Sequence, residues 1–265
     1  MKDLLLCIDI GNSNIVVGAY AGQELLFISR IATDRLRTGD QYAVELKDIL
    51  RLNQTDCSDY SGAIIGSVVP SLSQTMAYAV ERITGHQPLI LGPGTKTGLN
   101  IRIDNPAETG SDLVAAAVAA KSKYPLPIII VDMGTATTIT AVDRDGAFIG
   151  GAILPGLRVS VDALVGKTSQ LTGIALTPPK KAIGKSTSDS MRSGAIFGTA
   201  GMIDGLIERF CEELGSEATV LGTGGLMDTI APYCRSRIIV DQDLLVEGLR
   251  LIYEKNRSEV RPCQD

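Results

Sequence analysis

Hydrophobic and polar positions follow the same order twice along the chain. Residues 4–33 contain an apolar run, a polar turn, a second apolar run, a turn at Gly22 and a third apolar run. Residues 127–156, "PIIIVDMGTATTITAVDRDGAFIGGAILPG", repeat that order. Runs of β-branched residues separated by polar glycine turns are typical of strands joined in a meander. We therefore expect each half of the chain to open with a three-stranded meander.

The stretches behind each meander predict further elements. Short apolar runs predict strands over 62–68, 88–91, 218–222 and 236–240, and amphipathic stretches predict helices over 40–53, 71–84, 157–166, 188–214 and 242–256. Residues 172–187 are expected to form a surface loop, and the last nine residues a tail. Since no linker rich in Pro, Gly or Ser separates the halves, we expect two similar α/β domains, 1–122 and 123–265, packed face to face.

Composition and charge narrow the classes of function. The chain has 265 residues, of which 45% are hydrophobic, enough for two domains with cores of their own. A net charge of -5 without a basic block argues against a nucleic-acid partner. No apolar run approaches the roughly 20 residues of a membrane helix, and no leader begins the chain. We therefore expect a cytoplasmic protein without a membrane partner.

The cysteine and histidine content limits the available chemistry. An odd count of cysteines without CxxC spacing favours reduced, structural thiols over disulfides or a zinc site. These are Cys7, Cys57, Cys211, Cys234 and Cys263. His86 is the only histidine and is expected at the surface, so a Ser-His-Asp triad or a histidine-rich metal centre has almost no material to build from. Carboxylates must supply any general base.

Two polar turns occupy matching places in the repeated meanders. One contains Asp9, Gly11 and Ser13, and the other contains Asp132, Gly134 and Thr135. Such turns present backbone N–H groups and a hydroxyl that suit phosphate oxygens, while the carboxylate faces the phosphates through a cation. A single Asp-x-Gly is a common turn former, but the matched pair favours a polyphosphate gripped from both sides of an interdomain cleft.

Three other glycine-containing stretches differ in what they indicate. The cluster "LGTGGL" at 221–226 is expected to hold the adenosine end of a nucleotide, although such a cluster is more often a helix entrance. The stretches 165–168 and 183–187 end like a P-loop, but the required first glycine is Val161 in one and Pro179 in the other. Neither is a Walker A motif.

Eight ordered motifs give the chain a resemblance to a known family over nearly its whole length. They are "DIGNSN" (9–14), "GSVVP" (66–70), "GPGTKTGL" (92–99), "DNPAETGSD" (104–112), "VDMGTATT" (131–138), "GGAILPG" (150–156), "GKST" (184–187) and "EGLRLIYEKN" (247–256). The chain resembles type III pantothenate kinase, of the acetate kinase, sugar kinase, Hsp70 and actin superfamily. The resemblance implies two duplicated ribonuclease H-like (actin-like ATPase) domains with a nucleotide cleft between them.

The resemblance also implies an activity and its site. The family transfers phosphate from ATP to pantothenate, the first step of coenzyme A biosynthesis, as a cytoplasmic homodimer that needs a divalent cation (Mg²⁺) and a monovalent cation (K⁺ or NH₄⁺). The implied ATP-binding residues are Asp9, Ile10, Gly11, Asn12, Ser13, Asn14, Ile15, Val16 and Thr135. The implied pantothenate-binding residues are Gly110, Ser111, Asp112, Leu113 and Thr187. Asp132 would hold the monovalent cation, and Asp112 would be the catalytic proton acceptor.

A carboxylate base also follows from the chemistry. Phosphoryl transfer to an alcohol needs in-line positioning, a metal that neutralises charge, and a group that takes the hydroxyl proton. On the helix expected after Pro106, Glu108 and Asp112 share a face at i and i+4, so either residue can be invoked. Glu108 also suits the simpler role of a first-turn acid that favours the helix dipole.

Two positions depart from the family pattern, and two alternative functions remain open. Leu113 stands where the family commonly has Arg, and Ile103 where it frequently has Tyr, so we expect weaker pantothenate binding or acceptance of pantetheine-like amides. One alternative is another kinase of the superfamily that acts on a different small alcohol. The other is a non-catalytic nucleotide-binding or transcription accessory protein of the same family.

Overall fold

The computed structural model describes residues 3–257, which form two compact units. The first unit comprises residues 3–99, 105–119 and 244–257, and the second comprises 100–104 and 120–243. Each unit is described by itself below. These units do not follow the expected boundary between residues 122 and 123, because the last helix packs against the first sheet and residues 100–101 pair with the second.

The end of the chain lies largely outside the described residues. This applies to Cys263, one of the five expected structural thiols, and to the expected tail apart from Arg257. The guanidinium of Arg257 pairs with the Asp3 carboxylate at 3.0 Å. The thiols of Cys7, Cys57, Cys211 and Cys234 are free.

Each unit contains one mixed sheet. The first has the strand order β3-β2-β1-β4-β5 and the second β11-β10-β7-β8-β9-β6. The strands of the first are β1 (Leu4–Ile10), β2 (Asn14–Ala21), β3 (Glu24–Ala32), β4 (Tyr60–Ser67) and β5 (Leu89–Ile90). Those of the second are β6 (Asn100–Ile101), β7 (Ile128–Met133), β8 (Ala136–Val142), β9 (Ala147–Pro155), β10 (Thr219–Thr223) and β11 (Ile238–Val240).

The two sheets share one topology. In each, three antiparallel strands form a meander, the fourth strand runs parallel to the first, and the fifth runs parallel to the fourth. The short strand β6 adds a parallel partner to β9 at the edge of the second sheet. The predicted duplication of a ribonuclease H-like α/β unit is therefore confirmed.

Helices connect and cover the strands. They are α1 (Gly39–Leu52), α2 (Pro70–Thr84), α3 (Ser111–Lys123), α4 (Leu157–Lys167), α5 (Thr187–Ser193), α6 (Thr199–Leu214), α7 (Met227–Ile230) and α8 (Leu244–Asn256). Short 3₁₀ turns are η1 (Cys57–Asp59), η2 (Pro106–Glu108) and η4 (Ala231–Tyr233), and η3 (Gly194–Gly198) is a π-helical turn between α5 and α6. None of the described helices is long and apolar enough to span a membrane.

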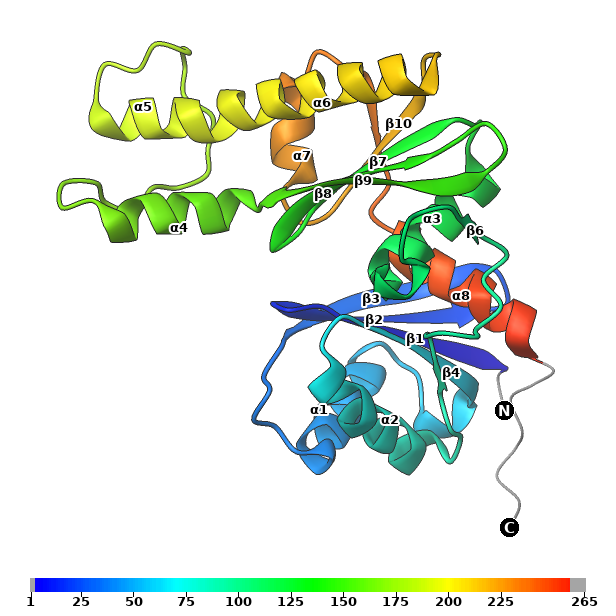
Figure 1. Ribbon diagram of the computed structural model, residues 1–265. Helices are drawn as coiled ribbons and strands as arrows, with labels where there is room; N and C mark the ends of the chain where they lie inside the picture. The colour runs from blue at the N-terminus through cyan, green and yellow to red at the C-terminus, as the bar shows by residue number, and fades with distance from the viewer. Residues whose placement is uncertain (1–2, 258–265) are drawn as a thin grey trace. The chain divides into compact units, whose positions relative to one another are not determined.

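Strand alternation gives the first sheet two different faces. Leu6, Ile8 and Ile10 of β1 join the core formed with α1 and α2. Because successive side chains point to opposite faces, Cys7 and Asp9 lie on the other face, against which α8 packs. Figure 1 shows α1 and α2 on one side of this sheet and α8 on the other. Asp9 thus lies at the end of a strand, on the face covered by α8.

The second unit has its own core. Ile129 and Val131 of β7 pack with Ile139 of β8, Ile203 of α6 and Met227 of α7. The helix expected over 188–214 is present as α5, η3 and α6.

The helix expected after Pro106 begins later than predicted. Residues Pro106–Glu108 form the 3₁₀ turn η2, and Thr109 is extended with φ -68° and ψ 123°. The first helical hydrogen bond of α3 runs from the Val114 amide to the Gly110 carbonyl at 3.1 Å. The expectation that Glu108 and Asp112 share a helix face is therefore wrong.

A buried carboxylate joins two distant segments of the second unit. Asp241, after β11, accepts hydrogen bonds from Lys123 Nζ at 2.5 Å and Tyr124 Oη at 2.7 Å. The Asp243 amide also donates to Asp241 Oδ1 at 3.1 Å. Burial acts to raise the pKa of Asp241, but these hydrogen bonds outweigh burial and hold its pKa below the ordinary value. The ionised form is thus favoured in the folded protein.

We predict that Asp241→Asn destabilises the protein at neutral pH by about 1–3 kcal/mol, because charge-assisted hydrogen bonds are lost. A carboxylate with a depressed folded pKa stabilises the fold above its unfolded pKa, near 3.9, and this stabilisation disappears as pH falls through the folded pKa. The difference in Tm between the parent and Asp241→Asn should therefore be constant from pH 7 to about 5 and become smaller at lower pH. Asp145→Asn, at an exposed carboxylate 3.5 Å from Arg102, is the control and should change little. An equal effect of both variants would contradict the prediction.

Candidate active site

The turn predicted to bind phosphate in the first unit, called the first phosphate turn, joins β1 to β2 and is closed by its own backbone. The Gly11 amide donates to the Asn14 carbonyl at 3.0 Å, and Thr33 Oγ1 donates to the Gly11 carbonyl at 2.7 Å. A Cβ at position 11 would lie 2.9 Å from the Asn14 carbonyl oxygen, so glycine allows this closure. The Gly11 amide is therefore used within the turn, while the side chains of Asn12, Ser13 and Asn14 are exposed.

The other residues predicted for this turn have different surroundings. Asp9 is only 5% exposed and pairs in register with Val16. Ile10 and Ile15 are fully buried in the first core, so their side chains serve packing. Any direct contact of these two with a nucleotide must come from the backbone.

The predicted base Asp112 lies in the first turn of α3 and is partly buried. Its Oδ1 accepts a hydrogen bond from the Leu113 amide at 2.8 Å. A Cβ at position 110 would lie 2.4 Å from that same Oδ1, so the carboxylate occupies space that only glycine leaves free. Burial raises the pKa of Asp112 above the ordinary value, against the lowering effect of the backbone hydrogen bonds. A raised pKa makes this carboxylate a better proton acceptor.

Gly66 brings Asp9 and the start of α3 together. Gly66 of β4 pairs in register with Asp9, and a Cβ there would lie 3.3 Å from Asp9 Oδ1 and 3.4 Å from Ser111 Oγ. Within residues 3–257, Ser111 Oγ and Thr109 Oγ1 are buried without a hydrogen-bond partner. A buried hydroxyl left unsatisfied costs about 1–3 kcal/mol, and such groups often mark a functional site.

Glu108, the alternative base, has different surroundings. It lies in η2, is exposed, and accepts a hydrogen bond from Asn105 Nδ2 at 2.7 Å. The structure therefore separates the two carboxylates that the sequence placed on one helix face.

The second phosphate turn resembles the first and is one residue shorter. The Gly134 amide donates to the Ala136 carbonyl at 3.0 Å, and the Gly156 amide donates to the Thr135 carbonyl at 3.2 Å. The register pair Met133–Thr137 closes this turn, as Ile10–Ile15 closes the first. Thr135 is exposed at its tip. The matched turns predicted from the repeat are therefore present, one in each unit.

The third glycine cluster lies beside Asp132. Gly224 has φ +92°, and a Cβ there would lie 2.6 Å from Asp132 Oδ1. Gly156 leaves similar room, because a Cβ there would lie 2.2 Å from the Thr135 carbonyl oxygen. The Asp132 carboxylate at Gly224 and the Gly134 and Thr135 carbonyl oxygens at Gly156 are oxygen ligands of the kind that suit a hard cation. Among the described residues, no group of three or more His, Cys, Asp or Glu could hold a metal ion.

The predicted acceptor residues fall into both units. Gly110, Ser111, Asp112 and Leu113 belong to the first unit, whereas Thr187 begins α5 in the second and is exposed. Ser186, the residue before Thr187, caps α5 by accepting from the Asp189 amide at 3.1 Å.

Two of the sequence motifs have a structural role. Asn256 in "EGLRLIYEKN" accepts from the Lys96 amide at 3.1 Å and donates to the Lys96 carbonyl at 3.0 Å. This pair ties the "GPGTKTGL" loop to the end of α8. Sequence reasoning gave Gly66 no role in the site, and it assigned the cluster that contains Gly224 to the adenosine rather than to the surroundings of Asp132. For Gly66 the available signal was a glycine within a strand.

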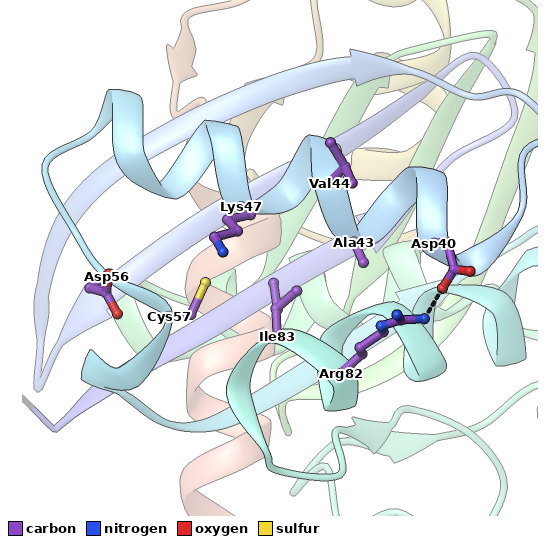
Figure 2. A pocket seen from close by; sticks show the side chains of 8 residues that line it. All are labelled: Asp40, Ala43, Val44, Lys47, Asp56, Cys57, Arg82 and Ile83. Carbon is purple, nitrogen blue, oxygen red and sulfur yellow. Dashed lines mark hydrogen bonds and ion pairs between the residues drawn. The ribbon is translucent and has the colours of Figure 1, made fainter.

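A groove elsewhere on the first unit is lined by none of the predicted site residues. It has a volume of about 410 Å³ and lies between α1, α2 and η1 (Figure 2). It is lined by Asp40, Ala43, Val44, Lys47, Asp56, Cys57, Arg82 and Ile83. Arg82 pairs with Asp40 in it, so two cations and two carboxylates balance and no net charge favours a phosphate. None of the lining residues was predicted from the sequence as a site residue.

Comparison with known proteins identifies the family. The family model described as type III pantothenate kinase matches residues 5–209. The chain belongs to the type III pantothenate kinase family. A type III pantothenate kinase from Moorella thermoacetica is 42% identical over 253 residues, covering 96% of this chain and all of that protein.

Solved structures support the fold of this family member. A conserved Baf-family protein from Campylobacter jejuni has a TM-score of 0.61 at 20% identity, covering 96% of this chain and 99% of its own. Component A of (R)-2-hydroxyglutaryl-CoA dehydratase from Acidaminococcus fermentans has a TM-score of 0.59 at 15% identity, with the same coverage. At these identities the likeness concerns the fold alone.

We predict that Asp112→Asn stabilises this member of the type III pantothenate kinase family at neutral pH. A carboxyl whose folded pKa is raised binds its proton more tightly in the folded state, so its ionisation costs stability above the unfolded pKa, near 3.9. Asn removes that cost and can still accept from the Leu113 amide. The Tm at pH 7 should rise by about 1–4 °C, which corresponds to a gain near 1 kcal/mol in the free energy of unfolding for a chain of this length. This gain in Tm should vanish below about pH 4. A lower Tm at pH 7 would show that burial of the charge is not costly here.

Proposed function

We propose that this chain transfers the γ-phosphoryl group of ATP to the primary alcohol of pantothenate, giving 4'-phosphopantothenate and ADP at the first step of coenzyme A biosynthesis. Membership of the type III pantothenate kinase family supports the reaction. The observation that carries the assignment of the site is the Asp112 carboxylate. It is partly buried, has a raised pKa, and is held over Gly110 by the Leu113 amide.

The roles of the residues follow from the chemistry of the transfer. The alcohol oxygen forms a bond to the γ-phosphorus while the bond from that phosphorus to the β,γ-bridging oxygen breaks, and ADP leaves. Asp112 orients the alcohol and takes its proton late in the transfer. Gly110 keeps the space that the carboxylate needs.

The two phosphate turns and their carboxylates would serve the nucleotide. The exposed polar side chains of Asn12, Ser13 and Thr135 are suited to phosphate oxygens. Asp9 would face the phosphates through a divalent cation such as Mg²⁺, which typically binds one or two carboxylates together with substrate phosphates. Asp132 would hold K⁺ or NH₄⁺ through its carboxylate. These cations supply charge neutralisation in the transfer.

The proposal also covers the acceptor, the oligomeric state and the cellular location. Leu113 gives the acceptor only apolar contact, so pantetheine-like amides should compete better here than at a site with a cation. We place the protein in the cytoplasm as a homodimer, as its family resemblance implies.

We predict that Asp112→Asn lowers kcat by about 10²- to 10⁴-fold, the usual effect of removing a general base, while ATP affinity changes little. Release of ADP in the presence of pantothenate, measured by a coupled assay, gives kcat and KM. Glu108→Gln is the matched control, because Glu108 is exposed and bonded to Asn105, and it should keep parental turnover. A parent protein that releases ADP with another alcohol and not with pantothenate would overturn the substrate assignment. Loss of turnover in Glu108→Gln alone would move the base to Glu108.

We predict that activity depends on potassium or ammonium through Asp132. A carboxylate beside a polyphosphate repels it unless a cation lies between them. With Mg²⁺ fixed, the rate should be at least several-fold higher in KCl than in NaCl of equal ionic strength, and Asp132→Asn should remove the difference. Equal rates of the parent in both salts would exclude Asp132 as a monovalent-cation ligand.

A further inference from the structure

The hydroxyl of Ser111 and the missing side chain of Gly66 share one small space. A Cβ at position 66 would lie 3.4 Å from Ser111 Oγ, 3.3 Å from Asp9 Oδ1 and 3.2 Å from Leu249 Cδ2. Contacts of this length are tighter than ordinary van der Waals packing, so Gly66 is the residue that leaves room for the hydroxyl. Ser111 Oγ and Asp9 Oδ1 therefore both border the small recess that Gly66 leaves open.

The surroundings of this hydroxyl point to a role with a bound nucleotide. Ser111 Oγ is buried, and no described residue accepts or donates a hydrogen bond to it. Buried hydroxyls are normally satisfied, so a partner that arrives with the ligand-bound state accounts for its retention. Asp9 Oδ1 lies on the same recess and can accept the hydrogen bond after a small adjustment of either side chain.

We propose that Ser111 is a positioning residue for Asp9, and that Gly66 makes this role possible. When a nucleotide and its cation engage Asp9, the Ser111 hydroxyl donates to the carboxylate and fixes its orientation toward the cation. This inference rests on the proposed function for the use of Asp9. It assigns Ser111 to the nucleotide side of the site, whereas the family resemblance assigned it to the acceptor.

The test moves the hydroxyl from one side of the recess to the other. Binding of a non-hydrolysable ATP analogue with Mg²⁺ is measured by calorimetry, and KM for ATP and for pantothenate by ADP release. Ser111→Ala should weaken analogue binding about 10-fold, the effect of a lost hydrogen bond to a charged group, with KM for pantothenate changed less than about 2-fold. Gly66→Ser should also weaken binding, because it crowds the recess. The double variant Gly66→Ser with Ser111→Ala again has one hydroxyl there and should recover to within about 3-fold of the parent.

A matched control and a second variant complete the design. Ser61→Ala removes a hydroxyl from the other end of the same strand, where Ser61 contacts Asp3, and should bind the analogue like the parent. If Gly66→Ser does not fold, Ser111→Cys carries the test, since a thiol of similar size is a weaker donor and should bind the analogue weakly.

Several results would overturn the inference. They are analogue affinity of Ser111→Ala or Ser111→Cys within 2-fold of the parent, a double variant as weak as Ser111→Ala, or a raised KM for pantothenate with unchanged analogue binding. Because analogue binding needs no acceptor, the affinity results are independent of whether the parent phosphorylates pantothenate, and only the KM comparison requires that reaction.

Discussion

The close approach of α8 to the first sheet is the constraint on which the first unit depends. Three strand glycines lie under this helix: Gly18 faces Val246, Gly62 faces Tyr253 and Gly66 faces Leu249. A Cβ at position 62 would lie 1.9 Å from the Tyr253 hydroxyl, so no larger residue fits there unless the Tyr253 side chain moves. Glycine in strand interiors is unfavourable by itself, and its presence here marks a place where another element must come close.

The same closeness fixes α3 and, with it, the candidate site. Gly248 of α8 meets the backbone of Ala115, where a Cβ would lie 1.8 Å from the carbonyl oxygen. Helix α3 is thereby held against α8, and its first residues are brought to the end of β1. Asp9, Ser111 and Asp112 come from segments about a hundred residues apart, and backbone contact between covering helices brings them together. The second unit uses glycines differently, because Gly156 and Gly224 pack directly against residues 132–135 of the predicted phosphate turn.

Much of the fold could be predicted because its signals are local. Alternating β-branched runs around Asp9 and Asp132 give the meanders, and the repeat of that pattern gives the duplication. The start of α3 could not be predicted in this way, because Thr109 is extended between a 3₁₀ turn and a helix that begins at Ser111. The membership of α8 in the first unit was also missed, since it depends on glycine contacts between residues more than 180 apart in sequence. Asp112 could be found from its sequence motif. The recess at Gly66 could not, because it is formed by contacts between residues far apart in sequence.

Several buried polar groups at the candidate site lower the stability of the free protein and are suited to binding and proton transfer. Ser111 and Thr109 have buried hydroxyls without described partners, and Asp112 is a carboxylate whose charged form is disfavoured by burial. Elsewhere in the first unit the buried charge of Arg250 is compensated: Arg250 donates hydrogen bonds to Glu247 and Glu254 and lies over the Tyr20 ring. The contrast shows that this chain can satisfy buried polar groups where only structure is needed. In the described part of the first unit, the buried polar side-chain atoms without a partner lie beside Gly66 and Gly110, and partners that arrive with substrate and nucleotide explain them better. A carboxylate with a raised pKa costs stability in the free protein, and the same raised pKa is what proton transfer requires.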